Sequence, residues 1–271
     1  MTAMLLNLLC AGILIACQVA PNESANPAEP TPAATTSIDS AEALLEALER
    51  SESDLRDLRG LVRYTTEQGL LGNVQVRTGD LFYRVDPAGE TRQFAIHFKE
   101  LRVDEKIESS SKDYVFDGRW LVERLNDEKQ FFKREVVAPG DSFDALSLDG
   151  PFPLPIGQRK DEILKRFDAR LLPPESSGRL AGHHHLELTP RDVTNELEDL
   201  EQVDLWYDST TLLPLRAVVV EKSGDISTVD LADLRRDTGV DQSMFATESP
   251  DVGSGWRIEV TRLKRDGERT P

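Results

Sequence analysis

The first apolar pattern of the chain has helical spacing. Between residues 40 and 53 the apolar positions i, i+3, i+4 and i+7 are filled by Ala41, Leu44, Leu45 and Leu48, which places them on one face of a helix. Glu42 stands three positions after Asp39, the spacing of a capping box. The pattern predicts an amphipathic helix that buries a leucine stripe.

From about residue 74 the apolar period changes to two. Large apolar residues recur at every second position in three representative groups: Leu81, Tyr83 and Val85; Phe94, Ile96 and Phe98; Val203, Leu205 and Tyr207. Turn signals such as Asp117-Gly118 and Ser223-Gly224-Asp225 separate the runs at short intervals. Alternation with short turns is typical of antiparallel strands that have one buried and one solvated face. The expected fold class is therefore mainly β, within the α+β group.

A Pro-rich loop interrupts this pattern in the middle of the chain. Residues 151–155 read PFPLP, and residues 159–170 read RKDEILKRFDAR. The second segment has a helical pattern, with Ile163, Leu164, Phe167 and Leu171 on one side, and two prolines follow it at 173 and 174. We expect one helix here, ended by the prolines.

The N-terminal residues predict an export signal. Residues 4–16 form an apolar run that is too short for a comfortable membrane span, and it ends in Leu14-Ile15-Ala16-Cys17. A small residue before a cysteine resembles a bacterial lipobox, in which the cysteine is acylated and becomes the new N-terminus. No Lys or Arg precedes Leu14, so a misplaced start codon, an ordinary cleaved signal and an uncleaved anchor remain alternatives.

The predicted organisation has three parts. Residues 1–17 are the signal peptide with its lipobox and the lipid attachment site Cys17. Residues 18–37 are rich in Pro, Ala, Ser and Thr, and such a segment buries too little apolar surface to fold, so it is expected to be a tether. Residues 38–271 contain no internal linker and are expected to form a single domain.

Charge and cysteine content narrow the function classes. The 271-residue chain has a formal net charge of -17, which repels nucleic acids. Its two cysteines are Cys10 and Cys17, so residues 38–271 can form neither a disulfide nor a thiolate metal site. No nucleotide-binding or catalytic motif is present, and we expect no cofactor and no enzymatic activity.

Three consecutive histidines are the one run that suggests a metal. Side chains of a strand alternate, so His183 and His185 share a face with Glu187 while His184 points the other way. A site formed by those three residues is one interpretation. The alternative, which we favour, is a solvent-facing stripe with no metal.

The order of the strand motifs resembles the LolA-like family of outer-membrane lipoprotein carriers. The motifs that carry the resemblance are GDLFYR (79–84), QFAIHF (93–98), YVFDGRWLV (114–122), HLELTPRD (185–192), VDLWYDSTTLLPLRAVVVE (203–221) and Met244-Phe245 ahead of Ser249-Pro250. The resemblance covers roughly residues 40–250. It implies a curved antiparallel half-barrel with a helical lid, and an activity of sequestering lipoprotein acyl chains in the periplasm.

The resemblance also implies a basic residue near the lid. The nearest match is Arg84, although the Arg-Pro of the family is replaced here by Val85-Asp86-Pro87 after it. A half-barrel leaves apolar side chains on a concave face, which an amphipathic helix or an acyl chain can cover. The candidates for lining this cavity are Leu81, Tyr83, Phe94, Ile96, Phe98, Tyr114, Phe116, Trp120, Leu205 and Tyr207.

The sequence therefore predicts a non-catalytic envelope protein that binds acyl chains of lipoproteins or phospholipid for lipoprotein sorting or transport. It would be a monomer held on the periplasmic side of the outer membrane by the lipid on Cys17, or otherwise be free in the periplasm. The alternative is a sensory or interaction lipoprotein that uses the same fold without transport.

Overall fold

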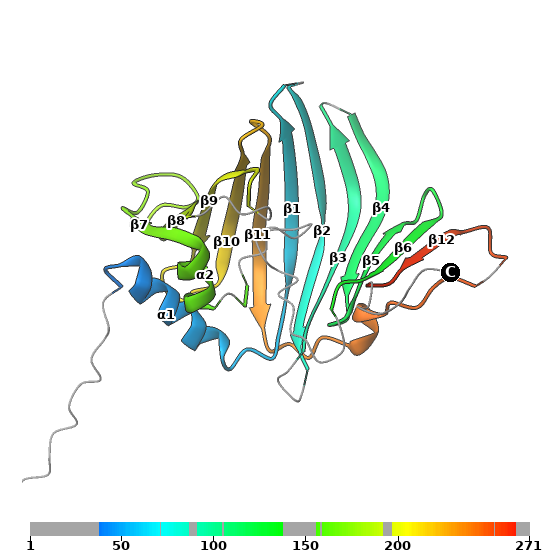
Figure 1. Cartoon of the computed structure of the whole chain (residues 1–271), viewed down its shortest axis with the longest axis horizontal. Coiled ribbons are helices and arrows are strands. Elements are labelled where there is room, and N and C mark those ends of the chain that lie inside the picture. Colours follow the sequence, from blue (N-terminus) through cyan, green and yellow to red (C-terminus); the bar gives the residue numbers. More distant parts are fainter. Residues whose placement is uncertain are drawn as a thin grey trace, which may run out of the picture. The chain divides into compact units, whose positions relative to one another are not determined.

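A computed structural model describes residues 38–70, 72–86, 91–104, 106–137, 156–157, 159–191, 197–251 and 253–263. Twelve strands form one sheet in the order β12-β6-β5-β4-β3-β2-β1-β11-β10-β9-β8-β7. The sheet is curved and open, with β7 and β12 at its two ends (Figure 1). The β12–β6 pair is parallel, and the other neighbouring strands are antiparallel.

The helices and strands have the following bounds: α1 Ala41–Glu52, β1 Asp57–Gln68, β2 Asn73–Val85, β3 Arg92–Val103, β4 Lys106–Phe116, β5 Trp120–Leu125, β6 Gln130–Glu135, α2 Lys160–Arg166, β7 Phe167–Leu172, β8 His184–Pro190, β9 Leu200–Tyr207, β10 Pro214–Glu221, β11 Ile226–Arg236, η1 Gln242–Phe245 and β12 Arg257–Thr261.

The two faces of the sheet carry different clusters. Residues of β3 alternate between them: Phe94 and Ile96 belong to the larger cluster, and Ala95 between them belongs to the smaller one. We call the face with the larger cluster the inner face and the opposite one the outer face. Both helices pack on the inner face, because Leu48 of α1 and Ile163 of α2 are members of the larger cluster.

Helix α1 confirms the predicted amphipathic helix. Its buried residues are the four of the predicted stripe, Ala41, Leu44, Leu45 and Leu48. The cap differs from the prediction, because Ser40 is the N-cap and its Oγ accepts a hydrogen bond from the N–H of Ala43 at 3.1 Å. A serine whose side chain reaches the N3 amide satisfies one of the free donors of the first turn.

The second predicted helix is shorter than expected. Helix α2 ends at Arg166, and Phe167–Leu172 continues directly as strand β7. The prediction of a helix to residue 170 was therefore wrong. The same apolar residues also fit a period of two, and pairing with β8 sets Phe167 and Leu171 on the inner face, with Leu171 opposite Leu186. Tertiary pairing overrides a short ambiguous pattern of this kind.

The outer face is covered along part of the sheet, which the alternating pattern did not predict. Val240 and Phe245 pack there with Ala95, Val115 and Val122. Lys133 holds the end of this covering segment, because its Nζ donates to the carbonyl of Thr247 at 2.9 Å. The outer face of β3–β6 is thus a second, smaller core.

Gly79 explains the first motif of the sequence resemblance. The register of β2 against β3 shifts between Thr78 and Gly79. A Cβ at Gly79 would collide with the carbonyl oxygen of His97 on the neighbouring strand. Only glycine permits this close approach, which accompanies a bulge in the curved sheet.

Candidate functional site

Nine of the ten predicted lining residues lie together on the inner face. Eight of them are members of one buried cluster, and Tyr114 is half-buried against it. Each of those eight residues is at most 2% exposed. The rings of Phe94 and Phe116 on adjacent parts of β3 and β4 have centroids 5.8 Å apart. The inner face is therefore one continuous apolar surface that extends from β9 to β4, and it is covered in this structure.

Trp120 does not belong to this surface. It is two residues before Val122, which packs in the outer cluster, so both side chains point outward. Its indole lies instead beside two cations, with Lys133 Nζ 4.9 Å and Arg119 Cζ 5.7 Å from the ring. The sequence placed Trp120 on the wrong face because its hairpin has the opposite phase to the one we assumed.

Arg84 also points outward. It follows Tyr83, whose side chain is in the inner cluster, and its guanidinium donates to the carbonyl oxygen of Val240 at 3.4 Å. Helix α1 lies on the other face. The structure thus corrects the expected contact between Arg84 and the lid, since alternation along β2 turns the two away from each other.

The lid is held by residues that the sequence reasoning missed. Glu52, the last residue of α1, accepts a hydrogen bond from the N–H of Gly157 at 2.7 Å. Arg92 of β3 donates to the carbonyl oxygen of the same glycine. Gly157 has φ 80°, and a Cβ there would collide with the Arg92 guanidinium. We call this set of residues the lid latch: Glu52, Gly157 and Arg92.

Two further contacts hold the helices. Arg236 of β11 donates to the carbonyl oxygen of Ser51 at 2.8 Å, so a cation meets a free carbonyl near the C-terminal end of α1, where such a charge is favourable. Lys160 of α2 lies 3.9 Å from Glu46 of α1. These polar contacts fix the position of α1, whereas its leucines provide the buried apolar area.

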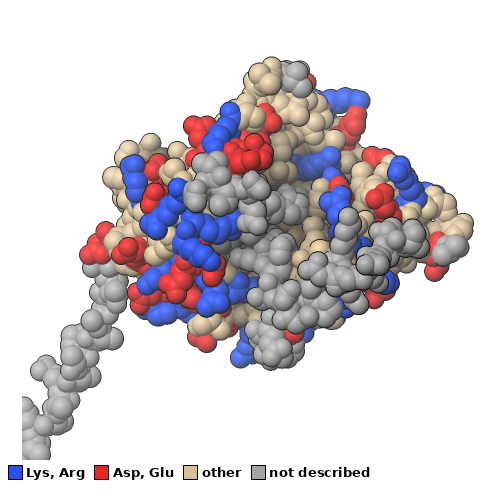
Figure 2. All heavy atoms as spheres, in the orientation of Figure 1, with Lys and Arg blue, Asp and Glu red and all other residues tan. Residues whose placement is uncertain are grey.

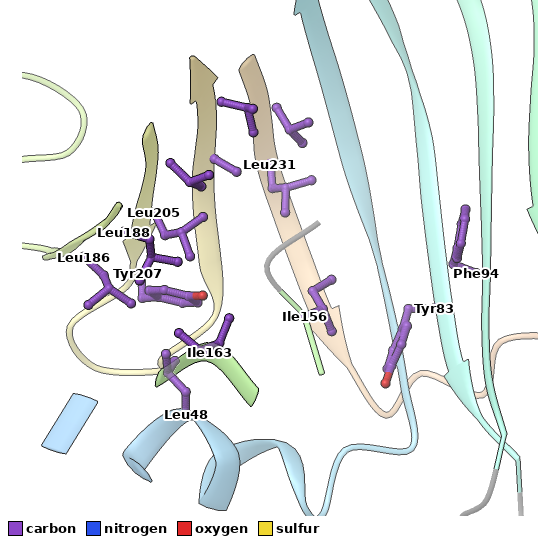
Figure 3. Packing of buried hydrophobic residues seen from close by; sticks show 14 of the residues in the cluster. Leu48, Tyr83, Phe94, Ile156, Ile163, Leu186, Leu188, Leu205, Tyr207 and Leu231 are labelled. Atoms are coloured by element: carbon purple, nitrogen blue, oxygen red, sulfur yellow. The ribbon is translucent and has the colours of Figure 1, made fainter. Parts of the chain in front are cut away.

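The helices cover one side of the inner face. Leu48 and Ile163 lie near Tyr207 and the leucines of β8, whereas Tyr83 and Phe94 lie on the far side of the view, with Ile156 between the two groups (Figure 3). Among the strands, β7 is the one against which both α1 and α2 pack. The aromatic part of the inner face, on β2–β4, thus belongs to the same apolar cluster but lies farther from the two helices.

Two tyrosines of the inner face stay neutral. Burial raises the pKa of Tyr207 well above its ordinary value, and the negative charge of Glu52 raises it further. Burial also raises the pKa of Tyr114, together with Glu123, to which the Tyr114 hydroxyl donates at 3.1 Å. Neither of these two tyrosines is therefore suited to act as a general acid or base near neutral pH.

His183 and His185 make contacts with protein side chains and backbone on the outer face of the sheet. The His185 ring stacks on Trp206 with centroids 4.1 Å apart, and its Nε2 is 2.8 Å from Asp204 Oδ1. His183 Nδ1 accepts a hydrogen bond from the N–H of Ser209 at 3.3 Å. Within the described ranges no three His, Cys, Asp or Glu side chains are grouped to hold a metal.

Basic and acidic side chains are interspersed over the face of the molecule in Figure 2. In the described part of the chain, no helix has the length and apolarity required to cross a membrane. Cys17 and the predicted tether lie outside the described residues.

No family model matches the sequence, and no curated protein matches it. Solved structures are similar to the chain at low identity. An uncharacterized conserved protein from Thermus thermophilus has 12% identity and a TM-score of 0.47, over 81% of this chain and 98% of that one. The MucA/MucB complex of Pseudomonas aeruginosa has 17% identity and a TM-score of 0.44, over 77% and 61%. A LolA superfamily protein from Nitrosomonas europaea has 14% identity and a TM-score of 0.35, over 76% and 97%.

The similarity to these structures concerns the fold. The alignment spans less than two thirds of the matched chain in the MucA/MucB complex. The sequence motifs implied a LolA-like fold, and the expected architecture is confirmed by the sheet itself: curved, unclosed, mainly antiparallel, with two helices on its inner face.

Proposed function

We propose that the inner face binds the acyl chains of a lipid or lipoprotein, and that helix α1 and an acyl chain compete for the same apolar surface. The chain acts without catalysis, in lipoprotein sorting or transport at the cell envelope. The observation that carries this proposal is that the leucine stripe of α1 and the apolar side chains from β9 to β4 form a single cluster.

The energies of the two occupants are similar. Burying the three leucines of α1 is worth roughly 1.5–3 kcal/mol each, or about 4.5–9 kcal/mol together. An acyl chain gains about 0.8 kcal/mol per buried CH₂, so about 6–11 methylenes compensate for the loss of the helix. A common fatty acyl chain is longer than this. An acyl chain can therefore displace the helix, and the return of the helix offsets part of the free energy that is lost when the ligand leaves.

The lid latch fits such an exchange. Its contacts are polar and lie at the C-terminal end of α1, where Glu52 meets Gly157. The strand residues that would contact the ligand take no part in it, apart from Arg92 at the start of β3. Opening the latch therefore loosens the C-terminal end of α1 while the sheet keeps its hydrogen bonds.

The proposed location follows from the N-terminal segment. Acylation at Cys17 would hold the body on the periplasmic side of a membrane, with residues 18–37 as spacer. A tethered body cannot diffuse across the periplasm. It would then act as an acceptor or a membrane-bound binder of acyl chains, with the outer membrane as the proposed site because Gln18 follows the cysteine instead of Asp.

Native mass spectrometry of residues 38–271, expressed in a bacterial host, tests the proposal. We expect a bound mass that matches a phospholipid or a fatty acid, and uptake of a fluorescent fatty acid after delipidation. Circular dichroism verifies that the protein is folded in the same preparation. A folded protein with no bound mass and no uptake would instead favour the alternative, an interaction module on this fold that carries no lipid.

A further inference from the structure

A pocket of about 980 Å³ lies where the α1–β1 connection, the end of β2 and the segment before η1 meet. Two of its lining residues reach the inner-face cluster: Leu55 is a member, and Val85 packs against it. The other lining residues include several charged side chains. The pocket therefore joins the apolar inner face to a polar rim at one end of the sheet.

Some of these charges are already committed. Asp57 is buried and accepts three hydrogen bonds, from the N–H and hydroxyl of Thr238 at 2.7 and 3.0 Å and from the N–H of Gly239 at 3.0 Å. Asp241 caps η1 by accepting a hydrogen bond from the N–H of Ser243 at 2.8 Å. Neither carboxylate needs a ligand.

Four charged side chains of the pocket are left with few or no partners among the described residues. Asp86 Oδ1 is buried and accepts no hydrogen bond. Arg84 makes one hydrogen bond, that of 3.4 Å to the carbonyl oxygen of Val240, and its charge also acts on the carboxylate of Asp241 in the same pocket. The exposed side chains of Asp54 and Arg56 line the same pocket, and no polar partner is found for either within the described ranges. A partly buried carboxylate without a donor is costly, because its lost hydration is not replaced.

These four side chains comprise two cations and two anions, and only Arg84 has a polar contact among the described residues, with Val240 and with the charge of Asp241. Arginine pairs well with phosphate through its planar fork of donors, and a carboxylate suits an ammonium group. We infer that this pocket binds a zwitterionic phosphoethanolamine group, with its phosphate at Arg84 and its ammonium at Asp86. For a phospholipid, the acyl chains would continue past Leu55 and Val85 to the inner face, and in that form the inference rests on the proposed function.

The test compares variants of the full chain, purified in mild detergent from a bacterial host whose membranes contain phosphatidylethanolamine and phosphatidylglycerol. Bound lipids are extracted and quantified per mole of protein. Removal of one charge-assisted hydrogen bond is expected to change affinity about tenfold. We expect Asp86→Asn to lower the ratio of phosphatidylethanolamine to phosphatidylglycerol about tenfold, and Arg84→Gln to lower both phospholipids relative to free fatty acid. Arg102→Gln, at an exposed position outside the pocket, should change neither.

A second arm separates a lipid headgroup from a free ligand. Calorimetric titration of the wild-type chain with O-phosphoethanolamine, with inorganic phosphate as reference, should show millimolar or tighter binding that Asp86→Asn weakens about tenfold if the free compound is the source. If the pocket binds the headgroup of a phospholipid, Asp86→Asn lowers the ratio of phosphatidylethanolamine to phosphatidylglycerol, and the titration with O-phosphoethanolamine shows no binding. An Asp86→Asn chain that behaves as wild type in both arms overturns the inference, whereas a wild-type chain without any bound lipid contradicts the proposed function.

Discussion

The carboxylate of Glu52, at the last residue of α1, accepts a hydrogen bond from the backbone N–H of Gly157 at 2.7 Å, and this contact joins the helix to a glycine 105 residues away in the sequence. The carbonyl oxygen of the same glycine accepts a hydrogen bond from the Arg92 side chain. One residue thus connects the helix that covers the inner face to a strand that forms it.

Glu52→Gln weakens this latch without removing apolar area. A hydrogen bond that involves a charged group is worth roughly 1.5–3 kcal/mol, so we expect uptake of a fluorescent fatty acid to become about tenfold faster in stopped-flow measurements. Glu49→Gln, on the exposed side of the same helix, is the matched control and should leave the rate unchanged. Equal rates in the wild type and both variants would exclude opening of the latch as the limiting step.

Leu48→Ala tests whether the helix covers the inner face as a structural element. Leu48 is 4% exposed, and its truncation should lower the free energy of unfolding by about 2–5 kcal/mol in urea denaturation. Leu70→Ala is the control, because Leu70 is 91% exposed and its loss should stay within about 0.5 kcal/mol. With saturating fatty acid the Leu48→Ala effect should shrink, since the ligand takes the place of the helix. An equal loss with and without ligand would contradict exchange.

The lowered pKa of Asp113 predicts how the free energy of unfolding depends on pH. Burial alone would raise the pKa of its carboxyl, but hydrogen bonds with His97 at 2.9 Å and Asn126 at 2.9 Å, together with the charges of His97 and Arg124, bring the pKa below its usual value. A carboxyl whose pKa is lower in the folded state contributes stability above its unfolded pKa of about 3.9, and this contribution is lost as the pH falls through the folded pKa.

We therefore expect the free energy of unfolding to decrease below about pH 4, and Asp113→Asn to make that decrease shallower. Asp208 and Asp241 also have lowered pKa values, so part of the decrease should remain. Asp39→Asn, at an exposed position, serves as the control. The account of Asp113 fails if the pH profile of the Asp113→Asn chain matches that of the wild type.

Cys17→Ala tests the anchor. Under the proposed acylation, the wild-type chain is found in the membrane fraction and the variant in the soluble periplasmic fraction. Cys10→Ala, within the same apolar stretch, is the control and should remain with the membrane. A Cys17→Ala chain that still sediments with membranes is not held there by acylation of that residue.

Periodicity gave the strands and the first helix because one face of each is buried. Around Leu81, Phe94 and Leu205 the large apolar residues recur at every second position, and nine lining candidates lie on one face for that reason. Trp120 was misplaced because a hairpin sequence does not state its phase relative to the neighbouring strands. Phe167–Leu172 was misjudged because a six-residue apolar pattern fits both periods, and pairing with β8 decides between them.

The polar contacts of the lid could not be predicted from the sequence. Arg92 is two residues before Phe94, so its side of the strand could have been inferred. Its partner could not, because Gly157 lies 65 residues further along the chain. Covering of the outer face by Val240 and Phe245 likewise depends on tertiary contacts. Short motifs implied the fold correctly, but Arg84, which they pointed to as a lid contact, faces the other side.

The most direct test of the central claim uses the position of the tryptophans. The chain has three, and none is in the inner-face cluster: Trp120 and Trp206 point outward, and Trp256 packs against the outer cluster. A fatty acid brominated on its acyl chain quenches indoles that it contacts. Replacing the half-buried Tyr114 by Trp places a fourth indole on the inner face, while Glu123 keeps its ion pair with Lys112 at 2.7 Å.

We predict that the brominated fatty acid quenches the added fluorescence of the Tyr114→Trp chain and leaves the wild-type fluorescence almost unchanged. Quenching of the wild-type tryptophans with no effect on the added indole would place the acyl chain on the outer face and contradict the account.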